Sequence, residues 1–175
     1  MTLVLGFLPF MLFAFLSRVS ADLALWAAFA AAFVVTIRDF VESPQLRLLD
    51  GTSFVLFGLL ALWRGFWDPG LSLDDLRLMV DLGLIGAILF SLARRRPFSL
   101  QYAGRSGWED AQFLRVNYVI SLVWLAAFTV MALADAINGV LMPALDLGVG
   151  ISVLALTAAI AFTLRYPASV QPPKT

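Results

Sequence analysis

The sequence predicts an all-α, polytopic membrane protein, a bundle of about six transmembrane helices. Hydrophobic residues make up 61% of the 175 residues and charged residues only 14%. The mean hydropathy is +0.91, and these values lie well outside the range of a soluble domain. The apolar residues also gather in six separate stretches, which cover residues 3–16, 23–37, 54–67, 79–93, 116–134 and 141–164.

The lengths of the stretches differ. The last two reach the ~20 residues that a helix needs to cross a hydrocarbon core of ~30 Å. The third and fourth become long enough when the mildly polar flanks 50–53 and 71–78 are added. The first stretch contains Gly6 and Pro9, so we expect it to be short and either kinked or half-inserted. Residues 1–175 are expected to form a single integral membrane domain.

The basic residues are distributed unevenly between the two sides of the predicted bundle. With six spans, nine fall on one side and three on the other, and the richer side is normally cytoplasmic. We therefore expect a multi-pass membrane protein with both termini in the cytoplasm. The nine residues are Arg38, Arg47, Arg94, Arg95, Arg96, Arg105, Arg115, Arg165 and Lys174, and the three are Arg18, Arg64 and Arg77.

Two polar segments are predicted on the cytoplasmic side, a loop at 94–115 and a short C-terminal tail at 166–175. In the loop, Arg94, Arg95 and Arg96 follow a span directly, and Pro97 blocks its continuation. Aromatic residues, including Trp108, alternate with charge in this loop, which is typical of a segment lying at the membrane surface. The three arginines are expected to anchor the topology and meet anionic lipid, or together with Trp108 to contact a partner.

Several charges fall within or just inside the spans, where each costs roughly 2.5–3.5 kcal/mol at the helix centre unless a partner or water is present. Arg64 and Asp81 flank the predicted turn around Pro69 and lie at similar depth, so we expect an ion pair between them. Arg77 precedes Asp81 by one turn and is a second partner. The remaining two residues, Asp135 and Asp146, flank the turn of the last hairpin.

These charges have two interpretations. They form a structural ion-pair network wetted by interfacial water, or they line an outward-facing vestibule that binds a cation, a proton or a lipid headgroup. Small residues in the spans, such as Gly83 and Gly86, likewise fit ordinary helix packing or a homo-oligomer interface.

The composition excludes several chemistries. The chain has no His and no Cys, so zinc sites, thiol nucleophiles and His-based acid–base catalysis are ruled out. Asp+Glu and Lys+Arg both number 12, which gives no net charge to attract nucleic acid. The acidic pair Glu109 and Asp110 lacks a third catalytic group. We expect no cofactor, no metal and no enzymatic activity.

Three short motifs carry a family resemblance. They are Phe7-Leu8-Pro9, the basic step Arg96-Pro97, and Leu114-Arg115-Val116-Asn117 before a span that contains Trp124. With the order of the spans, these motifs resemble the bacterial intracellular septation protein A family, inner-membrane proteins of similar length. The resemblance implies a role in septation and cell-envelope maintenance through cell-envelope or division membrane proteins, and it carries over no catalytic residues.

The leading functional hypothesis is a non-enzymatic inner-membrane protein of cell-envelope maintenance and septation, acting through membrane partners or lipid. The alternative is a small transporter or channel for a proton, a cation or a lipid. In that case Arg64, Asp81, Asp135 and Asp146 would line its polar path.

Overall fold

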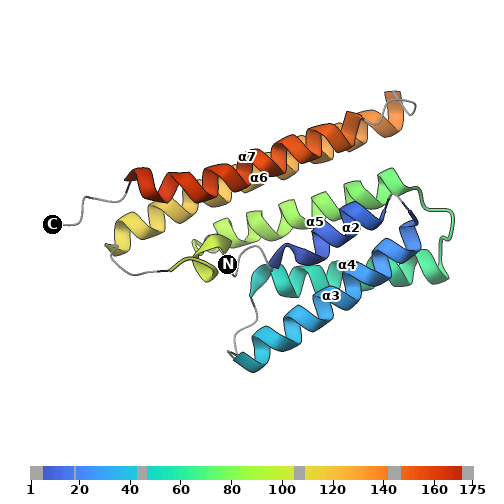
Figure 1. Cartoon of the computed structure of the whole chain (residues 1–175), viewed down its shortest axis with the longest axis horizontal. Helices are drawn as coiled ribbons and strands as arrows, with labels where there is room; N and C mark the ends of the chain where they lie inside the picture. The colour runs from blue at the N-terminus through green and yellow to red at the C-terminus, as the bar shows by residue number, and fades with distance from the viewer. Residues whose placement is uncertain (1–5, 18, 43–46, 105–108, 142–146, 171–175) are drawn as a thin grey trace. The chain divides into compact units, whose positions relative to one another are not determined.

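The computed structural model describes residues 6–17, 19–42, 47–104, 109–141 and 147–170. These residues form helices and contain no β-strand. Five of the helices are long and apolar enough to cross a membrane, so the expected all-helical membrane bundle is confirmed. The elements in chain order are α2 (Leu8–Leu16), α3 (Ala21–Glu42), α4 (Leu48–Phe66), α5 (Leu73–Ala93), the 3-10 helix η1 (Phe98–Gln101), α6 (Asp110–Leu141) and α7 (Leu147–Val170), shown in Figure 1.

Helix α2 is the short first helix that the sequence predicts. Its nine residues rise roughly 14 Å at ~1.5 Å per residue, about half of a hydrocarbon core. Of the two alternatives for this stretch, a kink at Pro9 is not seen, because Pro9 lies in the first turn of α2. A proline at this position removes no intrahelical hydrogen bond, so the helix starts there without bending.

The other helices extend beyond the apolar stretches. As expected, α4 and α5 include the mildly polar flanks before residues 54 and 79. Two predicted boundaries are wrong. Residues 110–115 of the predicted loop belong to the first turns of α6, and residues 166–170 of the predicted tail belong to α7. Helix α7 continues past Pro167, and its last carbonyl, that of Val170, accepts a hydrogen bond from Gln112 Nε2 at 2.8 Å.

The chain divides into two compact units, Met1–Ala87 and Ile88–Thr175. In the first unit α3 packs against both α2 and α4. Every fourth residue of α3 from Ala24 to Ala32 is a fully buried alanine, which allows neighbouring helix backbones to approach closely. Aromatic rings fill the space beside them: Phe57 of α4 lies 5.1 Å from Phe10 and 5.5 Å from Phe13 of α2 between ring centroids.

The second unit is built around α6, which packs along α7 and also contacts η1; Figure 1 shows α6 and α7 side by side over most of their length. Trp124 of α6 packs against α7. Its indole is buried, and Nε1 donates a hydrogen bond to Thr163 Oγ1 of α7 at 3.0 Å. This bond fixes the register of the α6–α7 pair.

Helix α5 ends in a Schellman motif. Arg96 N–H donates to the Ser91 carbonyl at 3.0 Å and Arg95 N–H donates to the Leu92 carbonyl at 2.9 Å. Arg95 has a φ of 56°, at the position that usually holds glycine in this motif. Pro97 follows and precedes η1, so the chain turns away from the helix axis where the sequence predicts.

Candidate functional site

The α3–α4 pair carries charged residues at both of its ends. At one end Arg64 Nε of α4 lies 2.6 Å from Asp22 Oδ1 in the first turn of α3. Arg64 Nη1 also donates a hydrogen bond to the Leu71 carbonyl in the α4–α5 connection. The side chain of Arg64 is 16% exposed and that of Asp22 is 64% exposed, so this ion pair sits at the edge of the unit and ties the connection to two helices.

The expected ion pair between Arg64 and Asp81 is wrong, because the partner of Arg64 is Asp22. Comparing the depths of residues along the α4–α5 hairpin was sound in itself, but α4 is connected in sequence to two helices, α3 and α5. Helix α3 is also antiparallel to α4, and its first turn reaches the same level as the last turn of α4. Sequence distance cannot decide which of two acids at one depth faces the arginine.

The remaining predicted charges are distributed over the two units. In the first unit, Arg77 Nη1 lies 3.7 Å from Asp74 Oδ1, one turn earlier on α5, and Asp81 is buried. In the second unit, Asp135 of α6 is buried. Asp146 lies outside the described residues. Within the first unit, Arg64 and Arg77 have Asp22 and Asp74 as their ion-pair partners at the distances given above.

A second charged cluster lies at the opposite end of the α3–α4 pair, and it contains two buried acids. Asp39 in the last turn of α3 is 6% exposed, and Asp50 in the first turn of α4 is 1% exposed. The side chains of Asp39 and Asp50 are within hydrogen-bonding reach of each other. Arg47 Nη1 donates to Asp39 Oδ2 at 2.6 Å, and Arg38 Nη2 lies 3.4 Å from Asp39 Oδ1.

The sequence analysis missed Asp50 as a site residue. It treated Asp50 only as a polar flank of α4. The signal was present, because Asp39 and Asp50 stand at similar distances from the α3–α4 connection. The depth argument used for other hairpins would have brought these two acids together.

The predicted interfacial loop is attached to the second unit by buried polar contacts. Ser99 Oγ of η1 is 2.8 Å from Asn117 Oδ1 and 3.2 Å from Ser121 Oγ, both on α6. Asn117 Nδ2 in turn donates to the Phe113 carbonyl at 2.9 Å. Phe98 beside Ser99 is fully buried. The part of the loop in η1 is thus packed against α6, and its position at a membrane surface stays a prediction.

The three arginines predicted as a partner or lipid contact are exposed. The guanidinium carbon of Arg94 stands 5.3 Å from the centroid of the Phe90 ring, a distance at which a cation is attracted to an aromatic face. Arg95 and Arg96 form the turn that ends α5. Trp108 lies outside the described residues.

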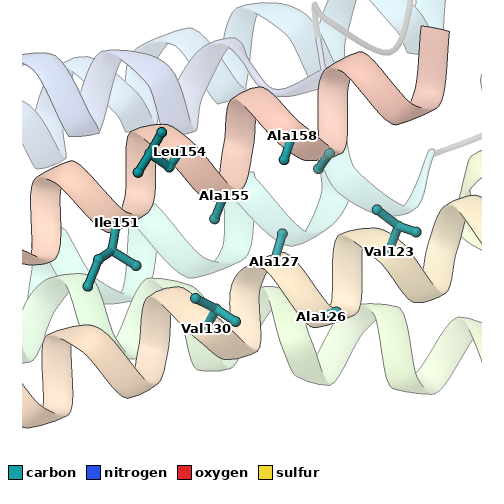
Figure 2. A pocket seen from close by; sticks show the side chains of 9 residues that line it. Val123, Ala126, Ala127, Val130, Ile151, Leu154, Ala155 and Ala158 are labelled. Atoms are coloured by element: carbon teal, nitrogen blue, oxygen red, sulfur yellow. The ribbon is translucent and has the colours of Figure 1, made fainter. Parts of the chain in front are cut away.

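An apolar groove of about 390 Å³ runs between α6 and α7. Figure 2 shows alanines and branched aliphatic side chains of both helices around it, among them Ala126, Val130, Leu154 and Ala158. Only 6% of the α7 span is buried, against 33–44% of the other four spans. The groove and the outer faces of α7 together form the least covered apolar surface among the described spans.

The described residues contain no group of three or more His, Cys, Asp or Glu that could hold a metal ion. The chemistry open to the acids is therefore proton binding and ion pairing, while the α6–α7 groove offers only van der Waals contact. The chain matches no family model, no curated protein and no solved structure. These features define the class, a helical membrane protein with five long apolar helices.

Proposed function

We propose that this chain is a non-enzymatic protein of the bacterial inner membrane that serves cell-envelope maintenance and septation by holding partner membrane proteins. The partners bind the α6–α7 pair. The observation that carries this proposal is the burial of only 6% of the α7 span, compared with 33–44% elsewhere. The side with nine of the basic residues is proposed to face the cytoplasm, and in the six-span arrangement both termini lie on that side.

The composition of the groove favours a protein helix as its occupant. Apolar burial does not drive association between helices in lipid, so close van der Waals packing has to provide the attraction. Ala126 and Ala158 are exposed within the groove, and small side chains let a second backbone approach closely. The fixed register of α6 and α7, set by Trp124 and Thr163, gives the groove a constant shape that a partner can match.

Site-specific photocrosslinking tests this proposal. A photoreactive residue at Leu154 of α7, where the side chain is 72% exposed, is compared with one at Leu59 of α4, where it is 62% exposed. We expect adducts with cell-envelope or division membrane proteins at position 154 and none at position 59. A groove-filling change, Ala158→Leu, should reduce the adduct several-fold, while Ala30→Leu on exposed α3 surface should leave it unchanged.

Equal adducts at positions 154 and 59, or no effect of Ala158→Leu, would contradict the proposal. Adducts with lipid alone would favour the transport hypothesis. Flux through liposomes, with and without Asp81→Asn, would then be the measurement to make.

A further inference from the structure

The Asp39–Asp50 pair has carboxylate oxygens for which the surrounding structure supplies no donor. Within the described part of the chain, no N–H or O–H group donates to either oxygen of the Asp50 carboxyl or to Asp39 Oδ1. The hydroxyls nearest to Asp50 are already committed, because Thr36 Oγ1 and Ser53 Oγ both donate to its backbone carbonyl, at 3.2 and 2.9 Å. Asp50 is also the more deeply buried of the two acids.

A buried carboxylate without a donor is rare, because a charged group removed from water needs hydrogen bonds to replace its hydration. The carboxyl of Asp39 is within hydrogen-bonding reach of the Asp50 side chain. Two carboxyl groups form a hydrogen bond only when one of them carries a proton. Such a proton would supply the missing donor to one of these carboxylate oxygens.

A metal ion fits the cluster less well than a proton. A hard cation takes six or more oxygen ligands, and the pair offers the three oxygens just described. Arg47 lies 2.6 Å from the other oxygen of Asp39 and Arg38 lies 3.4 Å from Asp39, and these two positive charges repel a divalent cation more strongly than a single proton. Helix α2, which also packs on α3, carries no charged residue.

We propose that Asp39 and Asp50 form a proton-binding site in which the two carboxyl groups share a single proton. The proton forms an O–H bond on one carboxyl and a hydrogen bond to the other, and the net charge of the pair becomes −1. Arg47 and Arg38 hold the ionised partner. Both arginines are partly exposed, and the cluster lies at the ends of α3 and α4, so the proton exchanges with water at that end of the helix pair. This site is independent of partner binding at α6 and α7.

Infrared spectroscopy of the full chain in lipid vesicles tests the proposal. The wild-type protein should show the carbonyl band of a protonated carboxyl at neutral pH, with a shift when Asp is labelled with ¹³C. Asp50→Asn should remove this band, because the amide cannot bind the proton, yet its N–H can still donate to Asp39. Asp22→Asn, at the exposed acid at the other end of α3, should leave the band unchanged.

Absence of any protonated-carboxyl band in the wild-type protein would overturn the proposal, as would an unchanged band in Asp50→Asn. If Asp50→Asn does not assemble, Asp50→Glu in ¹³C-Asp-labelled protein serves the same purpose. This variant keeps an acid at position 50, but the new Glu carries no ¹³C label. Loss or displacement of the ¹³C-shifted carbonyl band would therefore assign the proton to the Asp39–Asp50 pair. An unaltered labelled band in Asp50→Glu would contradict the assignment.

Discussion

Arg95 is the described non-glycine residue at which the backbone departs most from the conformations that L residues prefer. Its φ of 56° lies in the left-handed region, where the Cβ approaches the carbonyl oxygen and costs roughly 1–2 kcal/mol. The two hydrogen bonds of the Schellman motif at the end of α5 require this conformation. The arginine is retained there despite the strain, in a run of three basic residues that the positive-inside rule places at a membrane surface.

Replacing Arg95 with glycine should therefore stabilise the protein. Glycine adopts a positive φ without steric cost, and part of this gain is lost to the greater freedom of glycine in the unfolded chain. We expect a net gain of about 1 kcal/mol or less. The measurement is the thermal unfolding midpoint in mild detergent. Arg94→Gly removes the same charge at a neighbouring position without a positive φ and should lower the midpoint. Lower midpoints in both variants would contradict the role given to φ.

At the scale of elements, α3 and α4 are held together at both ends by charged residues and between the ends by apolar packing. Asp22 pairs with Arg64 at one end, and Asp39 pairs with Arg47 at the other. The stretch of α3 from Asp22 to Asp39 rises roughly 26 Å at ~1.5 Å per residue. This distance is close to the thickness of a hydrocarbon core, so we expect both clusters to lie near the headgroups if α3 crosses the membrane.

A double-mutant cycle distinguishes the observed partner of Arg64 from the one expected from the sequence. Arg64→Gln and Asp22→Asn should show a coupling energy of about 0.2–1 kcal/mol, the range for exposed ion pairs, since the Asp22 side chain is 64% exposed. Arg64→Gln and Asp81→Asn should be additive within about 0.5 kcal/mol. Unfolding free energies in mild detergent provide the measurement. Coupling to Asp81 but not to Asp22 would contradict the pairing of Arg64 with Asp22.

At the scale of the whole molecule, the arrangement of spans determines which loops face the cytoplasm. The segment after α5 and the connection between α4 and α5 lie at opposite ends of one long helix. If α5 spans the membrane, the two segments are on opposite sides. The sequence contains no cysteine, so a single introduced cysteine reports the side on which it lies without interference.

Cysteine labelling tests the orientation directly. Ala103→Cys, in the exposed segment after α5, should react with a membrane-impermeant reagent only after the membrane is opened. Asp68→Cys, in the connection between α4 and α5, should react with the same reagent in intact cells. Changing Arg94, Arg95 and Arg96 to Gln removes three of the nine basic residues on the cytoplasmic side. This change should increase the fraction of inverted molecules, whereas three Lys replacements should preserve the orientation. Reaction of Ala103→Cys in intact cells without these changes would contradict the predicted topology.

The sequence by itself determined the class of the fold and most of its helices. Apolar stretches of sufficient length have few alternatives to helices in a membrane, because backbone groups in lipid must satisfy their own hydrogen bonds. The turn around Pro69 and the end of α5 before Pro97 were predictable from proline, which cannot continue a helix normally. The helix boundaries at residues 110–115 and 166–170 were not predictable, since a polar segment at a membrane surface can either continue a helix or end it.

Only the tertiary structure decided which charges meet. Arg64 had acids at its own depth on both α3 and α5, and the sequence gives no measure of which helix face each acid occupies; the structure assigns Asp22. In the same way, Asp39 and Asp50 are ordinary helix-end acids in the sequence. They become a buried pair because α3 and α4 pack with both carboxyl groups turned inward, away from every described donor except Arg38 and Arg47. Hydropathy describes how strongly a residue prefers lipid or water. Which charged side chains pair depends instead on the direction in which each side chain points, and helix packing sets that direction.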